Sequence, residues 1–306
     1  MFRVANYAQH QLTMSYAMRT QGSLAERQIQ IASGKQAQYY SNISTKASEL
    51  VNVERAVART TQFTRNIDQA LTRLGIMESA VGTMTDRATE VLSIISSAMS
   101  GENISDVPLQ EFAATFLAEI ESLLNTQHED RYLFAGSQTN NPAVDLSDVN
   151  YTPQAGLPGV FTADTDYYQG DTLQLAVRSA ETFETTYGIT ADEPAFEELL
   201  RALSYMDYAG ANLDGAVLEQ AFTMMKSAVD GLSDIRGRIG ASSKVLESAK
   251  SGHEDYLTYT TNLVSTLEDV DMAEATTRLA QDEVQLQASY LSLSRLSQLS
   301  LLNYLR

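Results

Sequence analysis

Apolar residues recur at seven-residue spacing in the second quarter of the chain. Two rows of them alternate three and four positions apart, which is the spacing of a coiled-coil seam. One row is Leu50, Val57 and Leu71, and the other is Val53, Ile67, Leu74, Val81, Ala88 and Ile95. The pattern predicts one helix from about Ser44 to about Gly101, a rod of roughly 80 Å at ~1.5 Å per residue. A rod of this length favours an elongated bundle over a compact globule.

The same spacing returns in the second half. Helix is predicted from Pro194, with a break near Gly210 and a restart at Leu213. The seam that follows consists of Leu218, Met225, Leu232, Ile239 and Leu246, and the last segment continues it with Met272, Leu279, Leu286 and Leu293. Gly237 and Gly240 interrupt this pattern, and we interpret them as points of close helix packing.

The first 35 residues form another amphipathic segment, with Ala17, Leu24 and Ile31 seven apart and Gly34 as a helix stop. Four basic residues and one acidic residue give this segment a net charge of +3, whereas residues 264–306 carry six acidic and three basic residues. Complementary charge and matched periodicity predict that the two ends of the chain pair.

The pattern changes between residues 131 and 193, after a shorter helix predicted from Pro108 to about Gln127. Short strands are predicted at residues 132–134, 160–161 and 172–177, separated by Gly, Asn and Pro turns. Nine acidic residues against two basic ones predict a small acidic β domain held out in solvent.

These elements predict a mainly α fold with a small β insert. It is an elongated antiparallel coiled-coil helical bundle with paired N- and C-terminal helices and a small mixed β outer domain. The predicted divisions are an N-terminal helix and turn (1–44), two halves of a helical rod (45–130 and 194–263), the acidic outer domain (131–193) and a C-terminal helix (264–306).

Composition excludes several classes of protein. The net charge of −18 disfavours nucleic acid and anionic membranes as partners, and no apolar run is long enough to span a membrane. Zero cysteines exclude a disulfide framework and a thiolate site. The first residues lack the basic and apolar regions of a cleaved signal peptide, so we expect any export to use a dedicated apparatus.

No catalytic constellation is present. His128, Glu129 and Asp130 resemble metal ligands, but consecutive residues on a helix point in different directions and no second His or Cys is near. Gly34-Lys35 lacks the rest of a phosphate-binding loop. We therefore expect no catalytic residue, no metal and no cofactor, and a protein that is not an enzyme.

The terminal helices are the candidate functional surface. Seven leucines crowd residues 291–305 with one charged residue among them, so apolar surface surrounds the helix. Packing within one chain and packing between copies both fit this periodicity, and the all-round apolar surface favours packing between copies. The predicted intersubunit residues are Ala17, Leu24, Ile31, Leu279, Leu286, Tyr290, Leu293, Leu296, Leu301 and Leu305.

Several short motifs resemble the flagellin family. Gln30–Lys35 is similar to the turn that ends the family's first helix, and Asp269–Ala275 resembles its acidic entry to the last helix. Gln285–Tyr290 and Ser300–Arg306 resemble the terminal helix itself. Arg131-Tyr132-Leu133-Phe134-Ala135-Gly136 resembles the entry to the outer domain, with Arg131, Tyr132, Phe134 and Gly136 as its marker residues, and is typical of hook–filament junction members. One departure is Tyr39–Ser44, which replaces an acidic segment.

The resemblance implies a structural subunit of the bacterial flagellum, located outside the cell and exported by the type III apparatus without a cleaved signal peptide. It further implies an adaptor ring made of copies of this chain, with hook-associated protein 1 on the hook side, flagellin on the filament side and a cytosolic export chaperone before secretion. The alternatives are a filament-forming flagellin and, from another class, a cytosolic coiled-coil scaffold or chaperone. Copy number separates the first of these from a junction protein.

Overall fold

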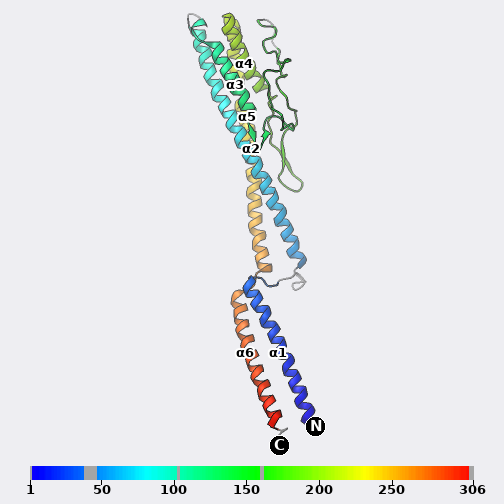
Figure 1. Cartoon of the computed structure of the whole chain (residues 1–306). Coiled ribbons are helices and arrows are strands. Elements are labelled where there is room, and N and C mark those ends of the chain that lie inside the picture. Colours follow the sequence, from blue (N-terminus) through cyan, green and yellow to red (C-terminus); the bar gives the residue numbers. More distant parts are fainter. Residues whose placement is uncertain (1, 38–46, 102–103, 159–161, 303–306) are drawn as a thin grey trace. The chain divides into compact units, whose positions relative to one another are not determined.

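The computed structural model describes residues 2–37, 47–101, 104–158 and 162–302, with side chains from residue 8 to residue 295 of these ranges. The chain forms two compact units. Unit 1 contains residues 1–59 and 256–306, and unit 2 contains residues 60–255. Helices dominate both units (Figure 1), which confirms the predicted mainly α fold.

Two long helices run through unit 2, α2 (Ala47–Ser100) and α5 (Gly215–Glu268). The predicted seams form the core between them, because all the following side chains are buried: Ile67, Leu74, Val81, Ala88, Ile95, Leu218, Met225, Leu232, Ile239 and Leu246. Ala70, Met77, Met84 and Val91 complete the alternation of three and four on α2. The heptad pattern therefore predicted one buried row on each long helix correctly. The other row predicted on α2 is one position out of phase in this unit, because Leu71 is half-buried and Ala70 is buried.

Two shorter helices cover this core, α3 (Leu109–Leu124) and α4 (Pro194–Asn212), and they pack against each other. Gly210 allows the close approach, because a Cβ there would lie 3.0 Å from that of Leu109. On α5, the glycine at a close contact is Gly231, where a Cβ would lie 2.7 Å from that of Ala195. The prediction of close packing at Gly237 and Gly240 is wrong, since no neighbouring atom lies within 4 Å of the Cβ positions there.

The insert between α3 and α4 contains two antiparallel two-stranded sheets. One pairs β1 (Gln127–His128) with β2 (Arg131–Tyr132), and the other pairs β3 (Ala176–Arg178) with β4 (Glu184–Thr186). The predicted strand at 172–177 is thus only partly right, since it begins at residue 176. The one predicted at 160–161 lies outside the described residues.

The insert is not held out in solvent, as the sequence led us to expect. Its buried residues share one continuous core with the helices of unit 2: Leu133, Phe134, Ala135, Ala143, Val144, Tyr167, Tyr187, Ile189 and Ala191. The insert lies along these helices in Figure 1. Acidic side chains occupy its solvent face while aromatic and aliphatic side chains face the helices, and net charge alone does not reveal this division.

Unit 1 contains α1 (Phe2–Ser33) and α6 (Met272–Leu302) together with the adjoining ends of α2 and α5. The two terminal helices lie side by side and antiparallel, with the start of α1 near the end of α6 (Figure 1). The predicted pairing of the chain ends is therefore confirmed.

The turn between α4 and α5 gives a first testable expectation. Leu213 has a left-handed backbone (φ 51°, ψ 40°) and a side chain that is 58% exposed, so it gains little burial at a position that favours glycine. We expect Leu213→Gly to raise the free energy of unfolding by about 1 kcal/mol. Urea denaturation of the purified chain measures this. Leu213→Ala keeps a Cβ and should show no such gain.

Candidate assembly surface

The seam between α1 and α6 fully buries only small and polar side chains among the described residues. Ala17 and Ala275 are buried, at 4% and 3% exposure, and Thr20 and Gln30 are nearly so. The larger predicted residues Leu24, Ile31, Leu279, Leu286 and Leu293 are only half-buried. The pair alone therefore removes little apolar surface from water, whereas unit 2 has a full core.

Two rows of apolar residues lie outside this seam. At 100° per residue, Met18 and Ile29 lie about 100–120° around α1 from Ala17, and Met14 lies at the near edge of this face, about 60° from Ala17. Val284 and Leu291 share the face of α6 opposite Ala275. The exposed fractions are 43%, 57% and 42% on α1, and 66% and 63% on α6. We call these five residues the outer rows.

The structure places the predicted intersubunit residues unevenly. Ala17, Leu24, Ile31, Leu279, Leu286 and Leu293 line the seam within the pair, and Tyr290 is 51% exposed beside it. The side chains of Leu296, Leu301 and Leu305 lie outside the described residues. The outer-row residues Val284, Met14, Met18 and Ile29 were missed, although apolar residues out of phase with the seam were the signal that could have found them.

The two helix-end motifs meet at one place. The Gly34 carbonyl accepts from the N–H of Val270 (2.9 Å), and the Glu268 carbonyl accepts from the N–H of Gln36 (2.7 Å). Lys35 forms an ion pair with Glu268. Gly34 reaches this geometry with a φ of 73°, which glycine adopts without strain. These bonds tie the end of α1 to the turn that precedes α6.

Asp271 explains the acidic motif before the last helix. Its Oδ1 accepts hydrogen bonds from the backbone N–H groups of Ala273 (2.9 Å) and Glu274 (3.1 Å). A carboxylate here caps the first turn of α6 and stabilises the positive end of the helix dipole. The motif thus starts α6 at a fixed point.

Opposite charge contributes little to the pairing, and the ion pair between the described residues of the two ends is that of Lys35 with Glu268. Between the two helices Ser23 donates to the carboxylate of Asp282 at 2.8 Å, and Arg278 pairs with Glu274 on its own helix. Arg19 and Glu283 are exposed. The net charges of the two ends are therefore compensated mainly by solvent within one chain.

The outer-domain entry motif packs the insert against α4 and forms a tight turn. Phe134 is fully buried and meets Phe196 of α4 edge to face, with ring centroids 5.9 Å apart. Gly136 has a φ of 66°, and a Cβ there would lie 2.3 Å from the Asp171 carbonyl oxygen. Tyr132 is half-buried and Arg131 is exposed at the end of β2.

Asp171 holds the other side of this turn. Its carboxylate accepts from the backbone N–H of Ser137 (2.9 Å) and from the Ser137 hydroxyl, and also from the N–H of Leu173 (3.1 Å). The bonds from Ser137 hold the pKa of Asp171 below its ordinary value. The motif therefore joins two distant parts of the insert.

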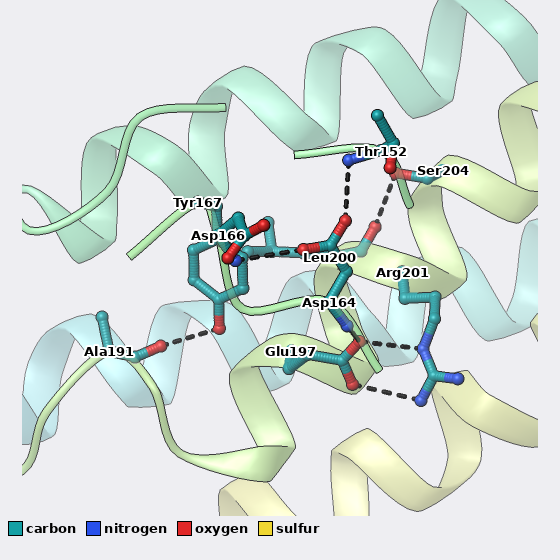
Figure 2. Close-up of polar contacts among 9 residues, drawn as sticks. All are labelled: Thr152, Asp164, Asp166, Tyr167, Ala191, Glu197, Leu200, Arg201 and Ser204. Carbon is teal, nitrogen blue, oxygen red and sulfur yellow. Dashed lines mark hydrogen bonds and ion pairs between the residues drawn. The ribbon is translucent and has the colours of Figure 1, made fainter. Parts of the chain in front are cut away.

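A buried polar cluster fixes the rest of the insert to α4 (Figure 2). Glu197 is 4% exposed, and its Oε1 lies 3.0 Å from Nε of Arg201 and accepts the backbone N–H of Asp164 at 3.1 Å. Burial raises the pKa of Glu197. Nearby, the hydroxyl of Tyr167 donates to the Ala191 carbonyl at 2.8 Å. Each group in the cluster has a partner inside the fold, so the cluster serves structure.

Within the described ranges, no group of His, Asp and Glu residues is arranged to hold a metal ion. His128 instead ends β1, and Glu129 and Asp130 form the tight turn to β2 with positive φ values of 52° and 59°. Among the described helices, none is long and apolar enough to cross a membrane.

Comparison with known proteins gives a consistent picture. Residues 222–305 match the family model of the bacterial flagellin C-terminal helical region. A flagellar hook-associated protein of Vibrio parahaemolyticus has a similar structure at 16% identity, with a TM-score of 0.59 over 72% of this chain and 97% of that one. No curated protein sequence matches the chain.

Two further solved structures share the fold. FlgL of Bacillus cereus is 18% identical, with a TM-score of 0.55 over 70% of this chain and 99% of that one. The flagellar junction protein FlgL of Legionella pneumophila is 12% identical, with a TM-score of 0.53 over 72% and 99% of the two chains. Residues 222–305 are therefore similar to the C-terminal helical region of bacterial flagellins, and the fold of the chain is one that it shares with flagellar hook-associated proteins.

Proposed function

We propose that this chain is a structural subunit of the bacterial flagellum that joins the hook to the filament. The observation that carries the proposal is the contrast between the two units. Unit 2 has a complete core, whereas the large apolar side chains in the seam of the terminal pair are only half-buried and two further apolar rows are exposed. An isolated pair with these properties gains too little burial to offset the entropy of ordering its backbone, about 1–2 kcal/mol per residue. Neighbouring copies supply the missing contacts.

The two outer rows support an assembly in which each pair has neighbours on more than one side. One row lies on α1 and the other on α6, and both point away from the seam within the pair. A surface with two separate contact faces builds a ring or a helical lattice, whereas a single self-complementary face builds a dimer. The side chains predicted to take part are those of the outer rows together with Tyr290, Leu296, Leu301 and Leu305.

A joining role is favoured over a filament-forming role by the insert. Its entry motif around Phe134 and Gly136 resembles that of junction members, and the similar structures from Vibrio parahaemolyticus and Legionella pneumophila are of a hook-associated and a junction protein. The matching C-terminal region keeps the filament-forming flagellin as the second candidate, since that region belongs to flagellins at large.

The partners follow from this role. Copies of the chain form the ring, hook-associated protein 1 (the hook-side neighbour) contacts one axial face and flagellin contacts the other. The chain leaves the cell through the type III apparatus without a cleaved signal peptide, after binding an export chaperone in the cytosol. The role is structural, with no catalytic step. The domain divisions drawn from the sequence belong to the same proposal, with residues 1–44 and 264–306 as the assembling segments.

Deletion of the gene tests the proposal. A strain without the junction subunit should make hooks that lack filaments and should release flagellin into the medium, because secreted flagellin finds no surface on which to assemble. A strain without a filament subunit should also lack filaments, but that flagellin would be absent from the medium. Normal filaments on the deletion strain would contradict both roles. Electron microscopy and immunoblots of the medium provide the readouts.

A further inference from the structure

We propose that the β3–β4 hairpin, residues 176–186, is a strap that closes over α2 and α5 near the edge of unit 2 and opens as a unit. The inference does not depend on the flagellar role, since it concerns the unassembled chain. It arises from how differently the two ends of the hairpin are held.

The far end of the strap is tied to α5 by a histidine. Nε2 of His253 donates to the backbone carbonyl of Ser179 at 2.6 Å. The ring of His253 stacks on that of Phe63 of α2, with centroids 5.8 Å apart and an interplanar angle of 28°. One side chain thus contacts both helices and the strap.

Little apolar surface is buried at this end. The buried side chains of the strap are Ser179 and Thr185, whose hydroxyl oxygens lie 3.2 Å apart, and Phe183 near the turn is 55% exposed. Segments with few buried apolar contacts open locally at a small fraction of the global unfolding free energy. At this end the strap is therefore held to α5 by the polar contact with His253 more than by apolar packing.

The near end is held firmly. Tyr187 is 3% exposed, and its hydroxyl accepts from Nη1 of Arg73 at 3.3 Å. The N–H groups of Tyr187 and Gly188 both donate to the Leu175 carbonyl, at 2.8 and 3.0 Å. Opening of the strap should stop at this point, because going further would expose the aromatic core of the insert.

The location gives the strap its effect. Within unit 2 the last fully buried large side chain towards the start of α2 is Ile67, and the last one towards the end of α5 is Leu246. Phe63 and His253 lie beyond this layer and are half-buried. In this part of unit 2, Nζ of Lys250 on α5 lies 2.7 Å from Oδ1 of Asp68 on α2, and the strap covers His253. Closing the strap therefore extends the ordered packing of α2 and α5 by one layer.

Hydrogen exchange of the full-length monomer, followed by mass spectrometry, tests the inference. In His253→Ala we expect exchange to accelerate about tenfold in residues 177–186, because the variant loses one hydrogen bond and one ring contact. Residues 60–66 and 250–255 should also exchange faster, and residues 187–193 should not change. His253→Gln keeps an amide donor and should restore much of the protection. Phe183→Ser alters the exposed end of the strap without touching the contact and serves as the control.

Three outcomes would overturn the inference. Unchanged exchange in residues 177–186 of His253→Ala would mean that the histidine does not hold the strap. Acceleration throughout the insert, including residues 131–146, would mean that the strap has no separate opening. Equal effects of His253→Gln and His253→Ala would remove the hydrogen bond from the explanation. Circular dichroism of each variant verifies that unit 2 remains folded.

Discussion

Replacing both Val284 and Leu291 by aspartate abolishes assembly of the chain while leaving its folded monomer intact. Both side chains are mostly exposed on the outer face of α6, so the substitution removes little contact within the chain. In an assembly each apolar side chain contributes about 1–2 kcal/mol on burial, and an unpaired carboxylate in the same place costs several kcal/mol more. The affinity between copies should then fall at least about a thousandfold.

Motility in soft agar and electron microscopy of cells complemented with the variant measure this effect. Circular dichroism and the thermal midpoint of the purified monomer check that the fold is intact. Val245→Asp is the matched control, since Val245 of α5 is 47% exposed and lies in unit 2. Cells that carry the double variant and still assemble filaments would show that the outer row of α6 is not a contact surface.

Gly136→Ala lowers the free energy of unfolding by roughly 2–5 kcal/mol, the largest effect of a single methyl group that we expect in this chain. The residue has a φ of 66°, and the added Cβ would lie 2.3 Å from the carbonyl oxygen and 2.4 Å from Oδ1 of Asp171. Movement of Asp171 would break its bonds to Ser137. The turn would then lose the contact that joins the two parts of the insert.

Urea denaturation of the purified chain measures the change. Gly75→Ala is the matched control, because Gly75 lies on an exposed face of α2 with no atom within 4 Å of its Cβ position. Alanine is a better helix former than glycine by about 1 kcal/mol, so the control should be stabilised. Equal stability of Gly136→Ala and the wild type would mean that the turn relaxes freely.

Periodic features of the sequence predicted the helices well. The seven-residue spacing of Ile67, Leu74 and Val81 reflects a repeated contact between two long helices, and such a contact produces a periodic pattern in the sequence. The stop at Gly34 also follows a local rule, because glycine adopts the left-handed conformation that ends a helix. The break expected near Gly210 was placed slightly early, since α4 continues through Gly210 to Asn212 and ends at a left-handed leucine, Leu213. The pairing of the chain ends could be predicted from periodicity and charge together.

The insert was predicted less well because its contacts are neither periodic nor local. Glu197 looks like an ordinary acidic residue of a helix, and only the fold brings the Asp164 backbone and Arg201 to it. The positions of β3 and β4 depend on their mutual pairing and on their contact with the helices. Acidic composition suggested a domain in solvent, whereas the buried side of the insert is set by a few aromatic residues such as Tyr167 and Tyr187.

Among the candidate assembly residues, the sequence found the seam more readily than the outer rows. Leu279 and Leu286 stand seven apart, but the structure shows that they line the contact within the chain. Val284 breaks that spacing and is the more exposed side chain. Periodicity identifies the strongest row of a helix, and exposure in the folded chain is needed to identify the rows left for neighbours.

The shared core of the insert and the helices restricts how this protein can change its outer surface. Phe134, Tyr167 and Tyr187 are buried against the helical part, so exchanging the whole insert for a foreign domain would leave holes in the core. Variation is cheaper at a turn such as Asp148–Asn150, where the carboxylate of Asp148 accepts from the backbone and side chain of Asn150 and Val149 is 90% exposed. A short peptide grafted there would leave the shared core intact, whereas one grafted at Phe134 or Tyr167 would not.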